Sequence, residues 1–357
     1  MIRLAQLMRD HQDELIQHYA SVMEPRHYHA MQSMIDCYTP ACGEVQYDCR
    51  PCLQHQHFCH ACGNRSCPTC QHKTNNDWLD RQRQKLLPVD YYMVTFTLPA
   101  ELRSFVWHHQ KWAYQTLFDI ARQTLMTFAK NDKKLNAILG LTGVLHTHSR
   151  RLEYHPHVHF IVPNGGLSPD KKYWKQKPGK YLFNGKQLAN VFRAKFIDAM
   201  KKQGYTLPEK TPNKWVTQCE SVGRGETAYV YLARYLYRGV MAEKNIINDM
   251  QGQVTFKYQE NKSKQWLTRT EPVAKFLWLI LQHVLPKGFR RARDYGYLHS
   301  NAQKSLRRLQ LILKVNLPKT PAINEHGCKQ KHPCPKCGLE MFMSQIFKPK
   351  KSAQPTN

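Results

Sequence analysis

The sequence lacks an uninterrupted apolar run of about 18 residues, the length that a membrane-spanning helix requires. Its beginning, Met1–His18, is amphipathic and charged, unlike a secretory signal peptide. Acidic residues are also scarce: 26 Asp and Glu face 53 Lys and Arg in 357 residues, which leaves a formal net charge of +27. A surface this basic gains free energy when phosphate contacts release counterions. We therefore expect nucleic acid as the partner and no membrane span.

Cysteine is nearly absent from the middle of the chain. Of the 12 cysteines, eight lie between Cys37 and Cys70, three lie between Cys328 and Cys337, and Cys219 stands alone. Clustered C-x-x-C pairs are typical of thiolate-bound zinc rather than of disulfides, so we expect a reducing, cytoplasmic location. Residues 37–72 also lack a periodic apolar pattern, which predicts that metal rather than a hydrophobic core holds them together.

Hydrophobic residues make up 41% of the whole sequence, and outside the cysteine clusters the chain alternates between helix-like and strand-like segments. Its length suits two or three domains. Apolar spacing predicts helices over residues 2–34, 75–86, 101–130, 187–203, 226–241 and 271–285, and strands over 91–98, 141–148 and 156–163. This mixture indicates an α/β or α+β protein.

The segment 154–166 reads YHPHVHFIVPNGG and is dense in histidine. One face of a strand here carries His155, His157 and His159, and the other carries Val158, Phe160 and Val162. Two imidazoles two residues apart converge in front of a sheet, which suits a divalent ion with open coordination positions. If the preceding strand pairs with this one, His146 or His148 completes a three-ligand site. The alternative is a row of surface histidines, and the strictly apolar opposite face argues against it.

Residues 229–241 read YVYLARYLYRGVM, and on a helix Tyr231 and Tyr235 project from one face with Arg234 and Arg238 close by. A phenol is a poor nucleophile because its pKa is about 10. A metal that polarises a phosphate, with guanidinium groups that hold it, offsets part of that deficit. Spacing alone favours half-buried packing tyrosines, as we expect for Tyr229 and Tyr237. The histidine strand is what makes the first two candidate nucleophiles.

Two further motifs lie towards the C-terminus. Residues 287–293 (KGFRRAR) place Lys287, Arg290, Arg291 and Arg293 near Phe289 and Tyr295. Cations with interleaved aromatics suit single-stranded DNA, and a solvated helix start is the alternative. Cys334-Pro-Lys-Cys337-Gly is similar to half a zinc knuckle, whose other half Cys328, His326 or His332 could supply. That pattern predicts a third zinc site.

The pattern H-hydrophobe-H followed by Y-x-x-x-Y resembles the HUH endonucleases, which include rolling-circle replication initiators, conjugative relaxases and some transposases. The resemblance is closest to the rolling-circle transposases of the IS91 insertion-sequence family. It is carried by Cys37-Tyr-Thr-Pro, by the cysteine pattern from Cys49 to Cys70, and by FTLPAELR at 96–103, VLHTHSRRLEYHPHVHFIVPNGGLS at 144–168, YLARYLYR at 231–238 and HVLPKGFRRARDYGYL at 283–298.

This resemblance implies an α+β protein in which an antiparallel-sheet HUH endonuclease core follows a small Cys-rich zinc-binding domain. It implies His157 and His159 as ligands of a catalytic Mg²⁺ or Mn²⁺, with His146 rather than His148 as third ligand because relatives carry a histidine in this L-H-T position. It implies Tyr231 and Tyr235 as nucleophiles that nick and rejoin single-stranded DNA through a 5′-phosphotyrosine. We expect a zinc-binding domain over residues 1–86, a nuclease domain over 87–300 and a basic tail over 301–357, in a bacterial protein associated with the nucleoid.

The chain departs from the family's zinc pattern at two positions, because Val45 and Ser66 stand where relatives have histidine. It gains Cys42 and Cys59. Our hypothesis is that these cysteines replace the histidines, so that eight thiolates fill two tetrahedral zinc sites at Zn–S distances of about 2.3 Å. The eight are Cys37, Cys42, Cys49, Cys52, Cys59, Cys62, Cys67 and Cys70, and His55, His57, His60 and His72 remain possible substitutes.

Three rival functions remain open at this point. A plasmid replication initiator shares the chemistry, and the zinc domain and the lack of a helicase motif favour a transposase. A relaxase usually places its tyrosine before the histidine motif, whereas here it follows. A non-enzymatic zinc-dependent DNA-binding regulator would leave the histidines a structural role.

Overall fold

The structure is a computed structural model that describes residues 2–177, 179, 181–237, 240–260, 263–315 and 332–349, and only the helical backbone of residues 72–73 and 234–237. Within these ranges, no helix has both the length and the apolar character that crossing a bilayer would require.

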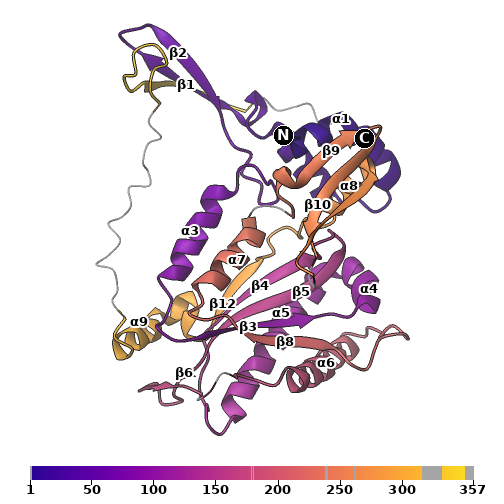
Figure 1. Cartoon of the computed structure of the whole chain (residues 1–357), viewed down its shortest axis with the longest axis vertical. Coiled ribbons are helices and arrows are strands. Elements are labelled where there is room, and N and C mark those ends of the chain that lie inside the picture. Colours follow the sequence, from indigo (N-terminus) through magenta and orange to yellow (C-terminus); the bar gives the residue numbers. More distant parts are fainter. Residues whose placement is uncertain are drawn as a thin grey trace.

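A five-stranded antiparallel sheet forms the centre of the molecule, in the order β12-β4-β5-β3-β8 (Figure 1). Its strands are β3 (Tyr91–Thr97), β4 (Leu141–His148), β5 (Tyr154–Pro163), β8 (Val216–Ser221) and β12 (Ala292–Tyr295). The predicted pairing of the two histidine strands is confirmed, because β4 and β5 form an antiparallel hairpin. The expectation of an α+β protein with an antiparallel core is confirmed as well.

The two faces of this sheet follow from the alternation of its side chains. Val158, Phe160 and Val162 are fully buried on one face, as predicted, and pack on α4 (Arg103–His108), α5 (Gln110–Asn131) and α6 (Gly185–Lys202). The opposite face carries the histidines and is covered by α3 (His72–Arg83) and α7 (Glu226–Tyr237). The sheet thus presents its histidine-bearing face, on which Val144 and Ile161 are also buried, to two helices that contact each other.

The N-terminal helices α1 (Leu4–Tyr19) and α2 (Pro25–Asp36) pack on α8 (Val273–Leu281), far along the chain. This second core also includes residues of a three-stranded sheet made of β9 (Ile246–Met250), β10 (Gln253–Gln259) and β11 (Trp266–Pro272). The helical part of the predicted zinc-binding domain therefore shares its core with segments after α7. The boundaries at 86 and 300 stay predictions.

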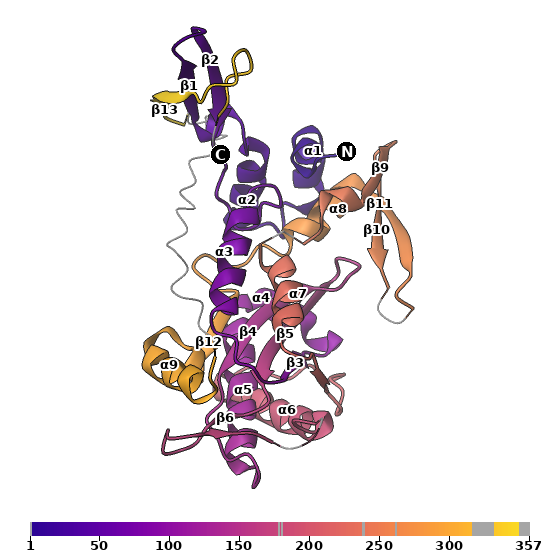
Figure 2. The same cartoon turned by 60° about the vertical axis from the view of Figure 1, so that its left-hand side comes forward.

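A small lobe projects from the body (Figures 1 and 2). It contains β1 (Glu44–Cys49), β2 (Gln54–Cys59) and β13 (Phe342–Phe347), in the order β13-β1-β2. We call it the terminal lobe, because its strands come from both ends of the sequence. The intervening helix α9 (Gln303–Ile312) lies at the other end of the body.

The sequence did not predict the strands of the terminal lobe, the sheet β9-β10-β11 or the edge strands β8 and β12. Most are short or exposed, so their apolar pattern is weak. The predicted helix over 101–130 is two helices, because His109 has non-helical φ and ψ angles of −122° and 34°. Its ring stacks on Phe105 at a centroid distance of 4.5 Å and contacts Tyr205 at 4.6 Å, so tertiary packing supports the break.

Candidate active site and metal centres

Three histidines converge on the face of the central sheet that α7 covers. His146 lies on β4 directly across from His157 on β5, and His159 follows two residues later. Candidate ligand nitrogens of the three rings lie within 4.8 Å of one another. The ring centroids are 4.5 to 5.2 Å apart. The histidine cluster (His146, His157 and His159) is therefore compact enough for one ion to contact all three rings.

Neighbouring polar groups orient two of these rings. His157 Nδ1 donates to the His155 carbonyl oxygen at 2.7 Å, which leaves Nε2 with the lone pair. His159 Nδ1 lies 2.8 Å from the Thr95 hydroxyl on β3. Such partners set the tautomer and orientation of metal-binding histidines. Sequence analysis missed Thr95, because only the strand register places it opposite His159.

Burial keeps the histidine cluster neutral. It lowers the pKa of His157 from 6.5 to about 4. Burial, followed by the charge of neighbouring histidines, also holds the pKa of His146 and of His159 well below the ordinary value. A neutral imidazole has the lone pair that a metal ligand needs, so the three rings are chemically ready to bind an ion.

Tyr231 lies beside the histidine cluster. Its ring, half-buried on α7, is perpendicular to the ring of His159 at a centroid distance of 6.4 Å. Tyr229 is instead buried, and its hydroxyl donates to Thr142 Oγ1 at 3.1 Å, so it is a packing residue as expected. Position 235 belongs to α7, but the side chains of Tyr235, Arg234 and Tyr237 and all of Arg238 lie outside the described residues.

Two other histidines of these strands make different contacts. The ring of His148 faces His283 at a centroid distance of 5.3 Å. His155 Nδ1 accepts a hydrogen bond from Arg103 at 3.0 Å. Of the two candidates for the third ligand, the structure brings His146 to the His157–His159 pair.

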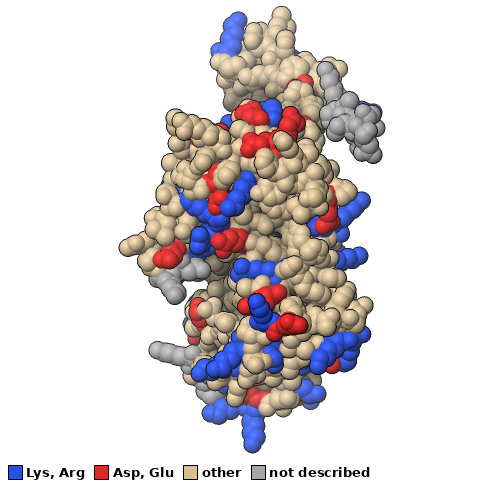
Figure 3. Space-filling view, turned by 90° about the vertical axis from the view of Figure 1, so that its right-hand side faces the viewer, with Lys and Arg blue, Asp and Glu red and all other residues tan. Residues whose placement is uncertain are grey.

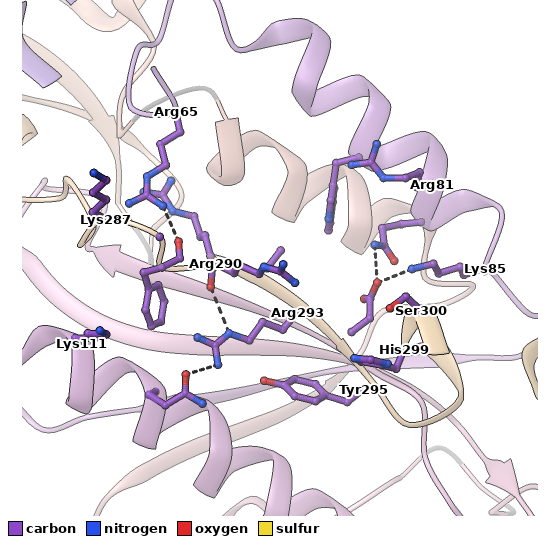
Figure 4. A pocket seen from close by; sticks show the side chains of 18 of the residues that line it. Arg65, Arg81, Lys85, Lys111, Lys287, Arg290, Arg293, Tyr295, His299 and Ser300 are labelled. Carbon is purple, nitrogen blue, oxygen red and sulfur yellow. Dashed lines mark hydrogen bonds and ion pairs between the residues drawn. The ribbon is translucent and has the colours of Figure 1, made fainter. Parts of the chain in front are cut away.

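A basic cleft of about 1410 Å³ opens along the edge strand β12 (Figure 4). It is bounded by α3, by the start of α5, by Arg65 of the cysteine-rich region and by residues 287–295. Eight of its described lining residues are cationic, and Asp294 is the single acidic one among them. The cations are Arg65, Arg81, Lys85, Lys111, Lys287, Arg290, Arg291 and Arg293. The cleft therefore gathers the four predicted cations of the 287–293 segment with four others that sequence analysis missed.

The cations of the cleft differ in how they are held. Arg81, Lys111, Lys287 and Arg290 are exposed, and all four lie around the cleft (Figure 4). Lys85, by contrast, pairs with Asp294. The exposed four are the groups best placed to meet a phosphate backbone.

Two aromatic rings beside the cleft, those of Phe118 and Phe289, support a cation. Arg293 lies over Phe118 and Phe289 at 4.4 and 4.8 Å and donates to Gln115 at 2.7 Å. Phe289 is only 8% exposed and packs in the main core. The apolar core therefore takes up the Phe289 ring and leaves little of it exposed for stacking on DNA bases.

The first thiol cluster consists of Cys37, Cys62, Cys67 and Cys70, whose sulfurs lie within 4.8 Å of one another. The Cys62 and Cys70 sulfurs are 3.7 Å apart, close to the roughly 3.8 Å expected of two thiolates on tetrahedral zinc. A hydrogen bond from the Cys62 thiol lowers the pKa of Cys67 to about 5, although its burial opposes this. Four such thiols fit zinc, which binds the thiolate form.

Arg65 extends from the loop between Cys62 and Cys67 to the edge of the cleft. Its guanidinium donates to the carbonyl oxygens of Leu285, Pro286 and Phe289 at 2.6 to 2.8 Å. The first thiol cluster is thus tied to the backbone that leads into the basic segment. In the sequence Arg65 is only one residue of a cysteine pattern, since nothing local identifies its distant partners.

The second thiol cluster joins Cys49 and Cys52 to Cys334 and Cys337. This corrects the hypothesis of two sites filled by N-terminal cysteines alone and that of a separate C-terminal site. Cys42 and Cys59 lie outside both clusters of the described chain, with their thiols directed to the Asp36 carbonyl and to Glu44. Cys328 lies outside the described residues, and His332 packs on Tyr47 and Phe58.

The candidate histidine substitutes do not join either cluster among the residues that the structure covers. They are His55 and His57 on β2 and His60 just after it, whereas the side chain of His72 is not described.

Comparison with known proteins finds two family models that match the chain. One, described as a transposase zinc-binding domain, matches residues 7–98. The other, described as a "putative transposase", matches residues 140–305, which include the histidine cluster, Tyr231 and the basic segment. The second thiol cluster extends beyond both matches.

Two curated proteins are similar over most of the chain. The "putative transposase y4qJ" of Sinorhizobium fredii is 28% identical over 348 residues, which cover 87% of each chain. The transposase for insertion sequence element IS801 of Pseudomonas savastanoi pv. phaseolicola is 27% identical over 289 residues, which cover 74% of this chain and 68% of that protein. No solved structure matches.

Proposed function

This chain belongs to the IS91-type transposases with an N-terminal zinc-binding domain, and on that premise we propose that it nicks and rejoins single-stranded DNA through a covalent phosphotyrosine. The observation that carries the proposal is the position of Tyr231 against the histidine cluster, at a ring-centroid distance of 6.4 Å from His159. A phenol from a helix and imidazoles from a sheet meet there around one point. We propose that this reaction drives rolling-circle-type transposition.

In the proposed reaction the Tyr231 oxygen attacks the scissile phosphorus. A P–O bond to tyrosine forms, the bond to the 3′ oxygen breaks, the phenol loses its proton and the 3′ oxygen gains one. One phosphodiester thus replaces another, so a hydroxyl can later rejoin the strand without ATP. Position 235 follows one turn later on α7, and we assign Tyr235 the second transfer.

His146, His157 and His159 would hold the catalytic ion, and three nitrogen ligands leave coordination positions for phosphate oxygen. When bound, a divalent ion draws electron density from the phosphate and stabilises the charge that develops. We propose Mn²⁺ or Mg²⁺, and the imidazole ligands favour Mn²⁺ because Mg²⁺ is the harder ion. Thr95 and the His155 carbonyl orient the rings.

The basic cleft supplies the proposed path for the DNA strand. Its exposed cations Arg81, Lys111, Lys287 and Arg290 would contact phosphates, whose binding would release counterions. Arg291 lines this cleft and also a small pocket that is lined by His148 and His283. It therefore lies between the cleft and the strand β4 that carries His148. We propose Arg234, Arg238 and Arg293 as further DNA contacts. Zinc in the first thiol cluster would hold the Arg65 loop against the cleft.

A nicking assay on single-stranded oligonucleotides from candidate element ends tests the proposal. With Mn²⁺ or Mg²⁺, the wild-type chain should form a covalent protein–DNA adduct visible on a denaturing gel. Tyr231→Phe with Tyr235→Phe should reduce the adduct to background and keep DNA binding. His157→Ala should do the same, because the ion loses a ligand.

Matched controls come from the same helix and the same strand. Tyr229→Phe removes a hydroxyl group that donates a hydrogen bond to Thr142. His155→Ala removes a histidine ring outside the histidine cluster. Both should retain the adduct. Adduct formation by the double tyrosine variant, or DNA binding by a wild-type chain that never forms an adduct, would overturn the nuclease assignment.

A further inference from the structure

The terminal lobe brings together two C-x-x-C pairs from opposite ends of the sequence. The sulfurs of the second thiol cluster lie within 4.8 Å of one another. The Cys49 and Cys337 sulfurs are 3.5 Å apart although 288 residues separate them in the chain. Two thiolates on one tetrahedral zinc lie about 3.8 Å apart, so the spacing is that of a shared ion's ligands.

Both pairs have the same local backbone form. The residue after the second cysteine has positive φ in each, 51° at Leu53 and 72° at Gly338. In the C-terminal pair, the Gly338 amide donates to the Cys334 carbonyl at 2.8 Å, and the Cys334 amide donates to Leu339 at the same distance. These tight turns direct two thiols of each pair to one point. Leu53 adopts a left-handed conformation that is costly for a residue with a Cβ atom, although its side chain is exposed.

The terminal lobe has little apolar core to hold β13 in place. Its buried apolar residues are Val45 on β1 and a cluster of Cys49, Cys334 and Met341, with Tyr47 and Cys52 packed beside that cluster. On β13, Met343 and Ile346 are 55% and 60% exposed. Figure 3 shows that the uppermost part of the molecule, where this lobe lies, carries few charged side chains on that face. A small three-stranded sheet with so few buried groups needs another source of stability.

We propose that Cys49, Cys52, Cys334 and Cys337 bind one structural zinc ion together, which makes the C-terminal segment part of the zinc-binding domain. The ion ties residues 332–347 to the N-terminal hairpin and closes a loop that spans most of the chain. Backbone pairing of β13 with β1, from Glu44 opposite Phe347 to Asp48 opposite Phe342, then completes the sheet. This inference rests on the zinc-binding character of the family and is independent of the nuclease chemistry.

Zinc content of the purified full-length chain tests the inference. The wild-type chain should contain two zinc ions, one in each thiol cluster. The double variant Cys334→Ser, Cys337→Ser should contain one. The matched control Cys42→Ser, Cys59→Ser also loses two thiols, from positions outside both clusters, and should keep two.

A second measurement covers the case in which the double variant fails to fold. Cys337→His preserves the number of ligands, so its two thiol clusters should still take up two zinc ions. With Co²⁺ in place of zinc, the visible d–d bands of this variant should shift, because one site changes from four sulfurs to three sulfurs and a nitrogen. Cys42→His should leave the spectrum as in the wild type.

One zinc ion in the wild-type chain, two in the Cys334/Cys337 double serine variant, or a loss of zinc from the Cys42/Cys59 variant would each overturn the shared site. An unchanged Co²⁺ spectrum in Cys337→His would do so too. Adduct formation is scored separately, so a failed nuclease assignment leaves these zinc counts interpretable.

Discussion

The central sheet and the terminal lobe both hold metal-binding side chains in place, but they do so in opposite ways. The histidine cluster lies on two adjacent strands whose other face is buried, with Val158 and Phe160 fully inaccessible. The second thiol cluster lies on turns with almost no core beneath them. In the sheet, packing positions the ligands before any ion binds. In the lobe, the ion itself is expected to supply the stability.

Removal of zinc should produce the largest difference in stability between these two regions. A tight chelator should remove protection from amide exchange across β1, β2 and β13, while β3, β4 and β5 stay protected. Structural zinc contributes about 10–16 kcal/mol of apparent binding free energy in zinc-finger peptides, far more than this lobe gains from burial. Hydrogen exchange followed by mass spectrometry measures both regions together. Loss of protection in β3–β5 at the same chelator concentration would mean that the sheet also depends on zinc.

Truncation of one phenylalanine in each region should sharpen the contrast. Phe160 is 0% exposed in the sheet and Phe342 is 41% exposed in the lobe. Phe160→Ala should lower the free energy of unfolding by about 3–5 kcal/mol, because it leaves a cavity. Phe342→Ala should cost under about 1 kcal/mol, mainly its contact with Arg50. Denaturant unfolding measures both, and equal costs would contradict the idea that only one region is held by packing.

Acid should destabilise the body through a buried histidine. His27 on α2 is 0% exposed and accepts a hydrogen bond from the Glu24 amide at 2.8 Å. Burial, and then the charge of Arg26, lower its pKa from 6.5 to about 4. In the unfolded chain His27 therefore binds a proton below about pH 6.5, whereas in the folded chain it binds one only near pH 4.

The stability contributed by neutral His27 should be complete above pH 6.5 and should be lost as the pH falls towards 4, by about 3 kcal/mol in all. The free energy of unfolding should be measured for wild type and for His27→Leu between pH 7 and 4. The difference between the two should shrink by about that amount as the pH falls. The conservative variant His27→Gln, measured over the same range, should show the same change as His27→Leu, because both remove the titrating group. Parallel curves for His27→Leu would refute this account.

Much of the candidate active site could be predicted from short stretches of sequence. The period-two alternation of 154–166 identified both the histidine face and the apolar face, because strand geometry relates neighbouring residues directly. The helical spacing of 229–235 likewise placed Tyr231 on a helix. Thr95 and Arg65 escaped prediction because each acts on a partner that is near only in the folded chain.

The sequence by itself determined the two histidine strands, the tyrosine helix and the thiol chemistry of zinc, because each depends on residue type and local period. The same patterns left the choice between α/β and α+β open. Tertiary structure alone decided which thiols share a cluster. Counting cysteines in the N-terminal region favoured Cys42 and Cys59, whereas the fold brings Cys334 and Cys337 to Cys49 and Cys52. The C-x-x-C pattern defines half of a tetrahedral site, and the other half depends on where distant segments of the chain meet.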